Sequence, residues 1–231
     1  MMEMKRVRDH LASIEEGYVR CFFIEGERAA LVIDGGVEAG LRERVNQQTK
    51  KPVTFLLTHS DPDHMAACDE FEKILLHPSE MARFMQKHPY SGELIAVQEG
   101  DQLDFEPYHF EIVLIPGHTP GSIALWEKSR RFLISGDSVT NATTFLFGEG
   151  RNLQAYLSSL RKLATIADQL DVIYGSHGPV EVSVARIGEL IELCEQVQRG
   201  QLQGTPAERF AGNIQEIRWK SAAIYYPALS K

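Results

Sequence analysis

The chain has 231 residues, enough for one large domain with its own core, and its 43% hydrophobic and 24% charged residues exclude wholesale disorder. Its formal net charge of -8 disfavours a nucleic-acid backbone or an anionic membrane surface as a partner. No apolar run approaches the roughly 18 residues of a spanning helix, and no secretory apolar region follows the basic N-terminus. Cys21, Cys68 and Cys194 form no CxxC pair, so we expect no disulfide framework and a cytoplasmic location.

Strands and helices are expected to alternate along the chain. In chain order we predict a hairpin of strands 18–24 and 29–33, a helix over 37–48, a strand over 53–57, helical segments near 66–72 and 79–87, strands at 108–114, 122–126 and 131–135, a helix over 152–168, a strand at 171–175 and a helix from 184 to 197. Residues 200–231 are predicted to be irregular, with one closing strand over 216–226. We expect a single domain over 1–231, in which 181–231 form a C-terminal helix and tail.

A faint internal repeat relates the two halves of the chain. The segment CFFI-EGER-AALVIDGG resembles IALW-EKSR-RFLISGD, and the two copies end in turns that contain Asp34 and Asp137. Each copy is followed by a predicted helix and then by a strand that ends at His59 or His177. This alternation favours an α/β sandwich of two related halves. For Asp34 itself, an ordinary turn at a strand end is the preferred interpretation.

The segment THSDPDH, residues 58–64, places His59, Asp61, Asp63 and His64 in a loop directly after an apolar strand. Loops at strand ends are where α/β enzymes position functional groups. Side chains of this kind would repel one another at close range unless a cation lay among them. A divalent metal ion is the simplest such cation, because imidazole and carboxylate are its usual ligands.

Three later strands also end in turns that are rich in glycine, proline or serine and carry one more ligand each. They are Pro116–Gly121 with His118, Ser135–Ser138 with Asp137, and Ser176–Pro179 with His177. Together with the first loop, these turns supply four histidines and three aspartates. That number of ligands suits two metal ions.

The motifs HxDxDH, GHTPGS, SGD and SHGP, in this order and spacing, resemble the metal motifs of the metallo-β-lactamase-fold hydrolases. The resemblance is closest to their glyoxalase II-like branch and covers residues 18–180. It implies an αββα four-layer sandwich with two metal ions at one edge. By motif it also implies His59, Asp61 and His118 as ligands of the first ion, Asp63, His64 and His177 as ligands of the second, and Asp137 as the bridge.

One position departs from the family pattern. The usual motif is HxHxDH, and Asp61 stands where its second histidine would be. Two divalent ions, three aspartates and a bridging hydroxide would bring the cluster to zero charge. A harder, more anionic site should favour iron or manganese and acidify bound water less. Related flavodiiron proteins carry glutamate here and bind iron, so zinc, iron and manganese all stay open, as does direct coordination by Asp61.

The resemblance implies hydrolysis of a small thioester, lactone or other ester by a metal-bridging hydroxide. Asp63 would orient the nucleophile or carry its proton. Phe145 and Phe147, in the loop 138–151, are expected to line the substrate pocket, or else to pack the next helix onto the core. Glyoxalase II grips glutathione with a C-terminal helical domain, and residues 181–231 are too few for that whole domain, so the substrate stays open.

Two other functions are alternatives to hydrolysis. The first is an iron-dependent redox enzyme, flavodiiron-like or persulfide dioxygenase-like, although the chain has no room for a flavin domain. The second is a non-catalytic metal-binding module, which the complete ligand set disfavours. We expect a small-molecule substrate, no nucleic acid and no membrane, and leave a homodimer open.

Overall fold

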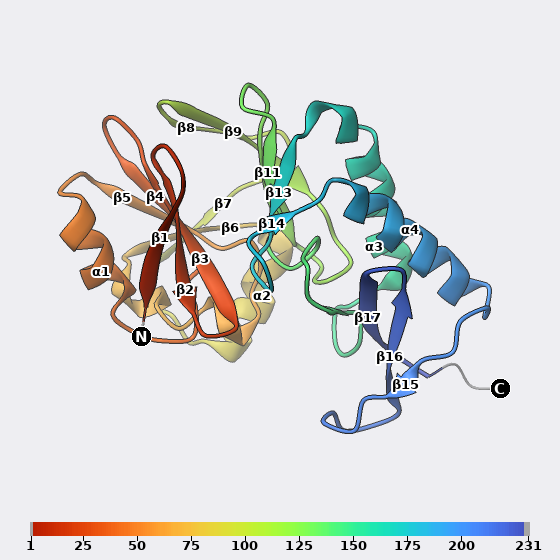
Figure 1. The fold of residues 1–231 in the computed structure, drawn as a ribbon. Coiled ribbons are helices and arrows are strands. Elements are labelled where there is room, and N and C mark those ends of the chain that lie inside the picture. The colour runs from red at the N-terminus through yellow and green to blue at the C-terminus, as the bar shows by residue number, and fades with distance from the viewer. Residues whose placement is uncertain (1, 229–231) are drawn as a thin grey trace. The chain divides into compact units, whose positions relative to one another are not determined.

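The computed structural model describes residues 2–228 (Figure 1). The chain separates into two compact units. Unit 1 comprises the chain up to Leu114 together with Ile123–Arg130. Unit 2 comprises Ile115–Ser122 and the chain from Arg131 onward. The single domain expected over 1–231 stays a prediction. Within the described residues, no helix has the length and apolar character that a membrane crossing would need.

The main sheet of unit 1 has seven strands in sequential order. They are β1 (Glu3–Arg8), β2 (Leu11–Glu16), β3 (Val19–Glu25), β4 (Ala30–Ile33), β5 (Val53–Leu56), β6 (Lys73–Leu76) and β7 (Glu93–Ala96). Strands β1 to β4 are antiparallel and β4 to β7 are parallel. The predicted β3–β4 hairpin and β5 are confirmed, whereas β1, β2, β6 and β7 were not predicted. Strand β1 lacks the alternation of apolar and polar residues that predicts a strand, because its sequence EMKRVR is mostly charged. Such a composition is typical of an edge strand.

Two helices belong to unit 1, α1 (Leu41–Gln48) and α2 (Pro78–Lys87). The predicted start of the first helix at Val37 is wrong. The Glu16 carboxylate accepts the N–H groups of Val37 and Glu38, at 2.7 and 2.9 Å, and Gly40 has a φ of 101°, so the helix begins only at Leu41. The second helix is confirmed, and its proline at the first helical position needs no amide partner.

The helical segment expected near 66–72 is only a short 3-10 turn, Cys68–Glu70, preceded by another at Pro62–His64. Three further strands complete unit 1: β8 (Gln102–Phe105), β9 (Tyr108–Leu114) and β10 (Ile123–Glu127), paired antiparallel in the order β8-β9-β10. The predicted strands at 108–114 and 122–126 are therefore confirmed.

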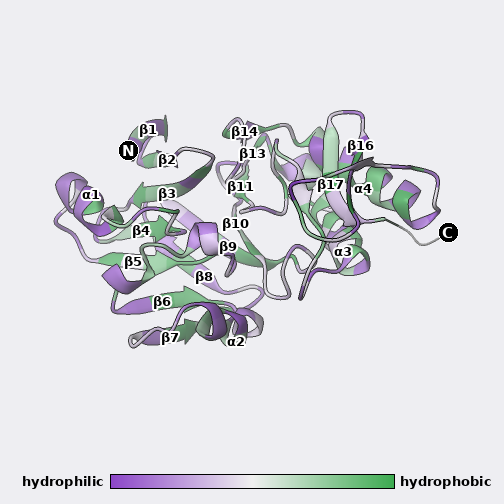
Figure 2. Cartoon of the chain, turned by 90° about the horizontal axis from the view of Figure 1, so that it is seen from below, coloured by the Kyte–Doolittle hydropathy of each residue, from purple (hydrophilic) through white to green (hydrophobic). Residues whose placement is uncertain are grey.

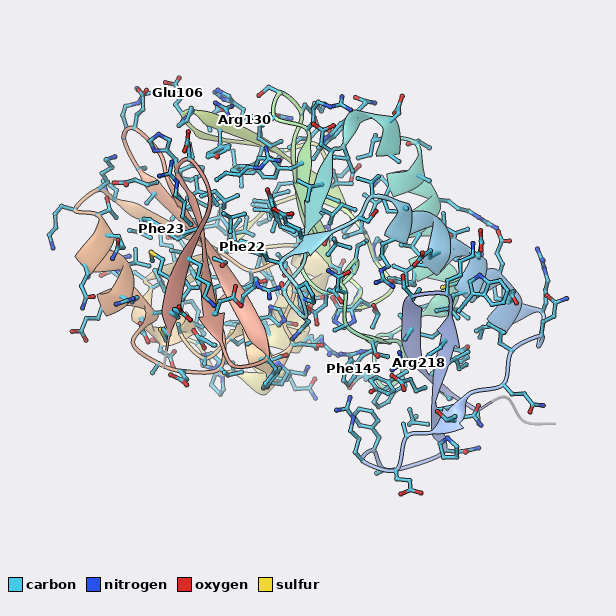
Figure 3. All side chains as sticks on the ribbon, in the orientation of Figure 1. Phe22, Phe23, Glu106, Arg130, Phe145 and Arg218 are labelled. Carbon is cyan, nitrogen blue, oxygen red and sulfur yellow. The ribbon has the colours of Figure 1, made fainter. Side chains whose placement is uncertain are left out.

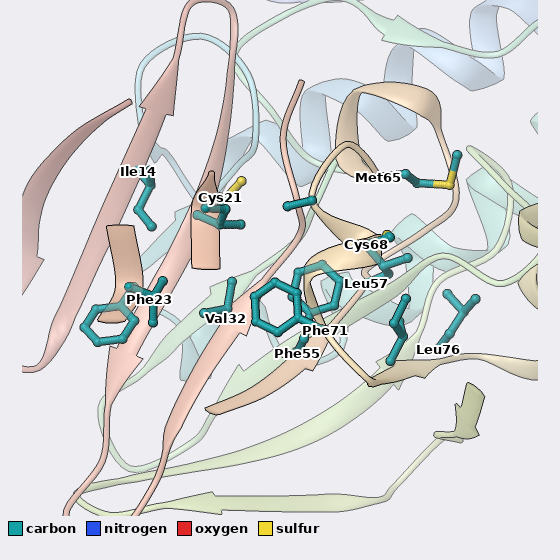
Figure 4. Packing of buried hydrophobic residues seen from close by; sticks show 14 of the residues in the cluster. Ile14, Cys21, Phe23, Val32, Phe55, Leu57, Met65, Cys68, Phe71 and Leu76 are labelled. Carbon is teal, nitrogen blue, oxygen red and sulfur yellow. The ribbon is translucent and has the colours of Figure 1, made fainter. Parts of the chain in front are cut away.

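The apolar core of unit 1 holds the HSDPDH loop at both of its ends (Figure 4). Leu57 lies two positions before His59 and Met65 immediately follows His64, and both are buried in one cluster. In the same cluster the rings of Phe55 and Phe71 stack with their centroids 4.2 Å apart. Burial of such side chains favours the folded state by about 1.5–3 kcal/mol each, so the loop ends are firmly held.

Unit 2 repeats the strand–helix–parallel strand arrangement of unit 1. Strand β11 (Phe132–Ile134) leads to helix α3 (Leu153–Ala164) and then to β13 (Val172–Tyr174), which pairs parallel with β11. In unit 1, β4, α1 and β5 follow the same order, and β4 is parallel to β5. These elements agree with the repeat seen in the sequence. Helix α3 ends four residues before its predicted end at 168, where a separate 3-10 turn, Ala167–Gln169, follows.

After β13 the chain forms the short strand β14 (Glu181–Val182) and helix α4 (Ala185–Gln198), which packs against α3. The predicted apolar face of α4 is confirmed, since Ile187, Leu190 and Cys194 are buried. Figure 2 shows both hydrophobic and hydrophilic colour on α4, as expected of a helix with one buried face.

The C-terminal segment is a small sheet, so the prediction of an irregular tail with one closing strand is wrong. Its strands lie in the order β12-β17-β16-β15. They are β12 (Thr144–Phe145), β15 (Thr205–Pro206), β16 (Ile214–Trp219) and β17 (Ala222–Pro227). Lys220, with a φ of 53°, turns the chain between β16 and β17 and converts the expected strand into a hairpin.

Candidate metal centre

The HSDPDH loop of unit 1 is compact and mostly buried. His59, Asp61 and His64 are buried, whereas the Asp63 side chain retains 24% exposure. Asp61 precedes the 3-10 turn in an extended conformation, and Pro62 begins that turn. The turn therefore folds the four candidate ligands of this loop back toward one another.

Asp34, at the end of β4, orients both histidines of the loop. Its carboxylate accepts the Thr58 amide at 2.7 Å, the Thr58 hydroxyl at 2.8 Å and the His64 Nδ1–H at 2.9 Å. Because the Thr58 hydroxyl donates to Asp34, it can accept the His59 Nδ1–H, 2.9 Å away. Both imidazoles are thereby fixed in the tautomer that leaves the Nε2 lone pair for a metal.

Asp34 was interpreted from the sequence as an ordinary turn residue, and that interpretation missed its role. The available signal was its place in the repeat, where it corresponds to the candidate ligand Asp137. The local backbone conformation also restricts which residues can occupy positions 34 and 35. Asp34 has a φ of 66°, and a Cβ on the next residue, Gly35, would lie 3.0 Å from the His64 carbonyl oxygen.

Each Nε2 atom of the loop faces a carboxylate at a distance suited to a shared metal ion. His59 Nε2 lies 3.8 Å from Asp61 Oδ2, and His64 Nε2 lies 4.0 Å from Asp63 Oδ1. These separations are too long for hydrogen bonds. Two ligand atoms that each lie about 2.0–2.2 Å from one tetrahedral ion are separated by roughly 3.3–3.6 Å. The loop therefore fits a divalent metal after small side-chain adjustments.

Unit 2 brings the remaining three candidate ligands together. His118 Nε2 lies 3.6 Å and His177 Nε2 lies 3.1 Å from the same atom, Oδ2 of Asp137. The Nδ1–H of His118 donates to the Phe145 carbonyl at 2.9 Å, which again leaves Nε2 for a metal. The His177 contact is within hydrogen-bond distance, and the bridging role expected of Asp137 stays a prediction.

Gly117 allows the turn that carries His118 to approach helix α3. It has a φ of 135°, and a Cβ at this position would overlap the backbone of Tyr156. The Tyr156 hydroxyl donates to the Ser138 carbonyl at 2.6 Å, next to Asp137. Helix α3 thus supports the turns of two candidate ligands.

Asp61 has two cationic partners that were not predicted. Its Oδ1 atom accepts a hydrogen bond from Arg83 Nη2 at 2.7 Å and another from Lys87 Nζ at 3.4 Å, both from helix α2. The negative charge counted for Asp61 in the sequence is therefore offset locally. A sequence does not identify which of its many charged residues will form such pairs.

Cysteine does not contribute to the candidate site. Cys21, Cys68 and Cys194 are buried free thiols. Burial raises the pKa of Cys194 to about 12 and raises the pKa values of Cys21 and Cys68 as well. These thiols stay protonated at neutral pH, so the candidate ligands are nitrogen and oxygen donors.

Phe145 and Phe147 belong to an aromatic cluster within unit 2. Phe145 lies beside the C-terminal hairpin (Figure 3), where its ring centroid is 5.0 Å from that of Tyr225 and 5.3 Å from that of Phe210. Phe147 lies 4.8 Å from Phe210 and also lines an open groove of about 640 Å³. Their expected contact with substrate stays a prediction.

Comparison with known proteins identifies the family. Residues 14–177 match the family model described as the metallo-beta-lactamase superfamily. The chain belongs to this superfamily. The family predicted from the motifs is thus confirmed.

Two relatives illustrate the similarity in sequence. A Bacillus subtilis protein described as probable metallo-hydrolase YqgX is 31% identical over 186 residues, which span 68% of this chain and 84% of the relative. A hydroxyacylglutathione hydrolase of Nitrosomonas eutropha is 29% identical over 175 residues, which span 71% of this chain and 62% of the relative. The chain thus matches less than two thirds of the length of that relative.

The fold is shared with solved structures. A metallo-beta-lactamase from Pontibacter korlensis superposes with a TM-score of 0.71 at 14% identity, over 84% of this chain and 99% of that one. At this identity the likeness concerns the fold alone. It confirms the α/β metallo-β-lactamase fold predicted from the sequence.

Proposed function

We propose that this protein is a dinuclear metal-dependent hydrolase of a small thioester, lactone or other ester. The main support is the ligand geometry, in which three histidines have Nδ1 held by an oxygen and Nε2 facing a carboxylate at 3.6–4.0 Å. The superfamily and the similarity to hydroxyacylglutathione hydrolases favour the same chemistry.

The proposed site combines the ligand sets of the two units. One ion would be held by His59, Asp61 and His118, the other by Asp63, His64 and His177, with Asp137 as the bridge. Two divalent ions, whether zinc, iron or manganese, would supply an acidified water and a Lewis acid for the substrate carbonyl. A small-molecule substrate and a cytoplasmic location belong to the same proposal, and the net charge of -8 disfavours nucleic acid or membrane partners.

Within this site, the side chains of the chain itself have distinct tasks. Asp34 and Thr58 keep His59 and His64 in the tautomer that ligates through Nε2. Asp63 is the more exposed carboxylate of its loop, so it is placed to take the proton of an attacking water. Phe145 and Phe147 would offer apolar surface to the acyl group of the substrate.

An iron-dependent redox enzyme is the second candidate function. The observation that favours it is Asp61, an oxygen donor at a position where the family pattern has histidine. Oxygen ligands suit harder metals than imidazole does. Such an enzyme would consume oxygen or a persulfide and leave thioesters intact.

The test is a panel of thioesters and lactones, assayed after metal reconstitution with wild type and with Asp137→Ala. Loss of the bridging carboxylate should displace one ion and lower turnover by on the order of a hundredfold or more. Phe147→Ala is the comparison variant, because loss of apolar surface should mainly raise KM. Undiminished activity of Asp137→Ala would contradict the bridging role. Oxygen or persulfide consumption by iron-loaded protein, without any ester turnover, would favour the redox function.

A further inference from the structure

Helix α2 contacts the HSDPDH loop of unit 1 through three charged side chains on one face of the helix. Glu80, Arg83 and Lys87 are spaced i, i+3 and i+7, which places them along one side of a helix. Glu80 accepts the Ser60 amide at 3.0 Å and also the Ser60 hydroxyl. Lys87 Nζ lies 3.3 Å from the Ser60 carbonyl oxygen. The helix therefore fixes the backbone between the candidate ligands His59 and Asp61.

The two oxygens of Asp61 have different partners. Oδ1 pairs with the guanidinium of Arg83 and the ammonium of Lys87, whereas Oδ2 faces His59 Nε2 at 3.8 Å. One oxygen is thus engaged by cations, and the other points to the candidate metal position. A carboxylate held in this way offers a metal one oxygen atom instead of two.

The burial of this ion pair distinguishes it from an ordinary surface salt bridge. The Asp61 side chain is 9% exposed and the Arg83 side chain is 14% exposed. Exposed ion pairs contribute little to the stability of the fold. In a buried pair, removal of one partner leaves the other charge poorly solvated and uncompensated, which is costly. Removal of Asp61 alone would leave two cations beside the candidate metal position, where they would repel a divalent ion.

We infer that Arg83 and Lys87 are positioning residues that offset the charge of Asp61 and hold it as a one-oxygen metal ligand. Asp61 and its two cations then act as a unit that replaces a neutral histidine. The site is accordingly less anionic than its three aspartates suggest. Its metal preference depends on Asp61, Arg83 and Lys87 together rather than on Asp61 alone. This inference rests on the metal site of the proposed function.

A double-mutant cycle tests the coupling directly. The proteins are wild type, Asp61→His, the pair Arg83→Met and Lys87→Met, and the triple variant that combines all three changes. Zn²⁺ and Mn²⁺ affinities are measured by competition with a chromophoric chelator, which requires no substrate. We expect Asp61→His alone to weaken Zn²⁺ binding about tenfold or more, and the triple variant to recover most of that loss.

The absorption spectrum of Co²⁺-loaded protein gives a second readout that a purely structural role would not change. In the Arg83→Met and Lys87→Met pair, both Asp61 oxygens become available to the ion. We therefore expect a higher coordination number, with weaker visible absorption and a relative gain in Mn²⁺ affinity over Zn²⁺. The single variant Arg83→Lys keeps a cation at Asp61, so its spectrum should stay close to that of the wild type.

Arg20→Met is the matched control. Arg20 is also well buried and pairs with a carboxylate, Glu15, at 3.0 Å, but Glu15 is not a candidate ligand. Arg20→Met should reduce stability without a change in metal preference. If Asp61→His binds Zn²⁺ as tightly as wild type, or if the effects simply add, the inference is wrong while the metal site stands. If wild type binds neither metal, both the inference and the proposed function fail.

Discussion

At the scale of single residues, Asp34 has the widest influence on the candidate site. It is fully buried, and its carboxylate serves Thr58 and His64 directly and His59 through the Thr58 hydroxyl. An amide at this position could still accept one hydrogen bond, but its NH2 group would donate to the other partner. The donor pattern around the two histidines would then no longer be satisfied.

We therefore predict that Asp34→Asn shifts the His64 proton toward Nε2 and weakens metal binding by about 10- to 100-fold. The measurement is metal affinity by chelator competition, with metal content determined after dialysis. The control is Asp104→Asn, because Asp104 also binds a histidine Nδ1, that of His109 at 2.8 Å, on the exposed surface. Equal losses in the two variants would contradict the role given to Asp34.

The residue scale also shows what the sequence could and could not predict. The seven candidate ligands were visible because each lies in a short polar turn directly after an apolar strand. Their long-range supporting partners were not visible, because Asp34 and His64 are 30 positions apart and Arg83 and Asp61 are 22 apart. A charged residue in a sequence does not specify its partner at such separations, which the tertiary fold decides.

At the scale of elements, short-range stereochemistry explains most differences between prediction and structure. The hydrophobic pattern located β3, β4, β5, α2 and α4 well. It placed the start of α1 too early, because the Glu16 side chain engages the backbone at Val37 and Glu38. It also missed the β16–β17 hairpin, whose turn at Lys220 lacks the glycine or asparagine that usually marks such turns.

The contact between Gly117 and helix α3 gives a prediction at this scale. Gly117→Ala adds a Cβ that overlaps the Tyr156 backbone, in a conformation that only glycine adopts easily. We expect the free energy of unfolding to fall by on the order of 2–4 kcal/mol, measured from the urea midpoint. Gly148→Ala is the control, since Gly148 has a φ of 92° but nothing within 4 Å of its Cβ position. A similar cost in both variants would mean that backbone strain, not the helix contact, dominates.

At the scale of the whole molecule, the candidate ligands divide between the two units. His59, Asp61, Asp63 and His64 belong to unit 1, and His118, Asp137 and His177 belong to unit 2. A dinuclear site built from both sets, as proposed, would link segments that are far apart in the chain. Metal binding should then stabilise the folded protein as a whole, because the unfolded chain cannot present these ligands together.

Removal of metal is accordingly predicted to lower the melting temperature. Free metal at about 100 times its dissociation constant stabilises the folded state by about 2.7 kcal/mol, which corresponds to roughly 5 °C or more for a chain of this length. The measurement compares thermal unfolding of metal-loaded wild type with the same protein after chelation and dialysis. Asp137→Ala, which should hold less metal, is expected to show a smaller difference. A melting temperature that does not respond to chelation, in protein shown to contain metal beforehand, would mean that the ion adds nothing to the stability of the fold and would contradict a site shared by both units.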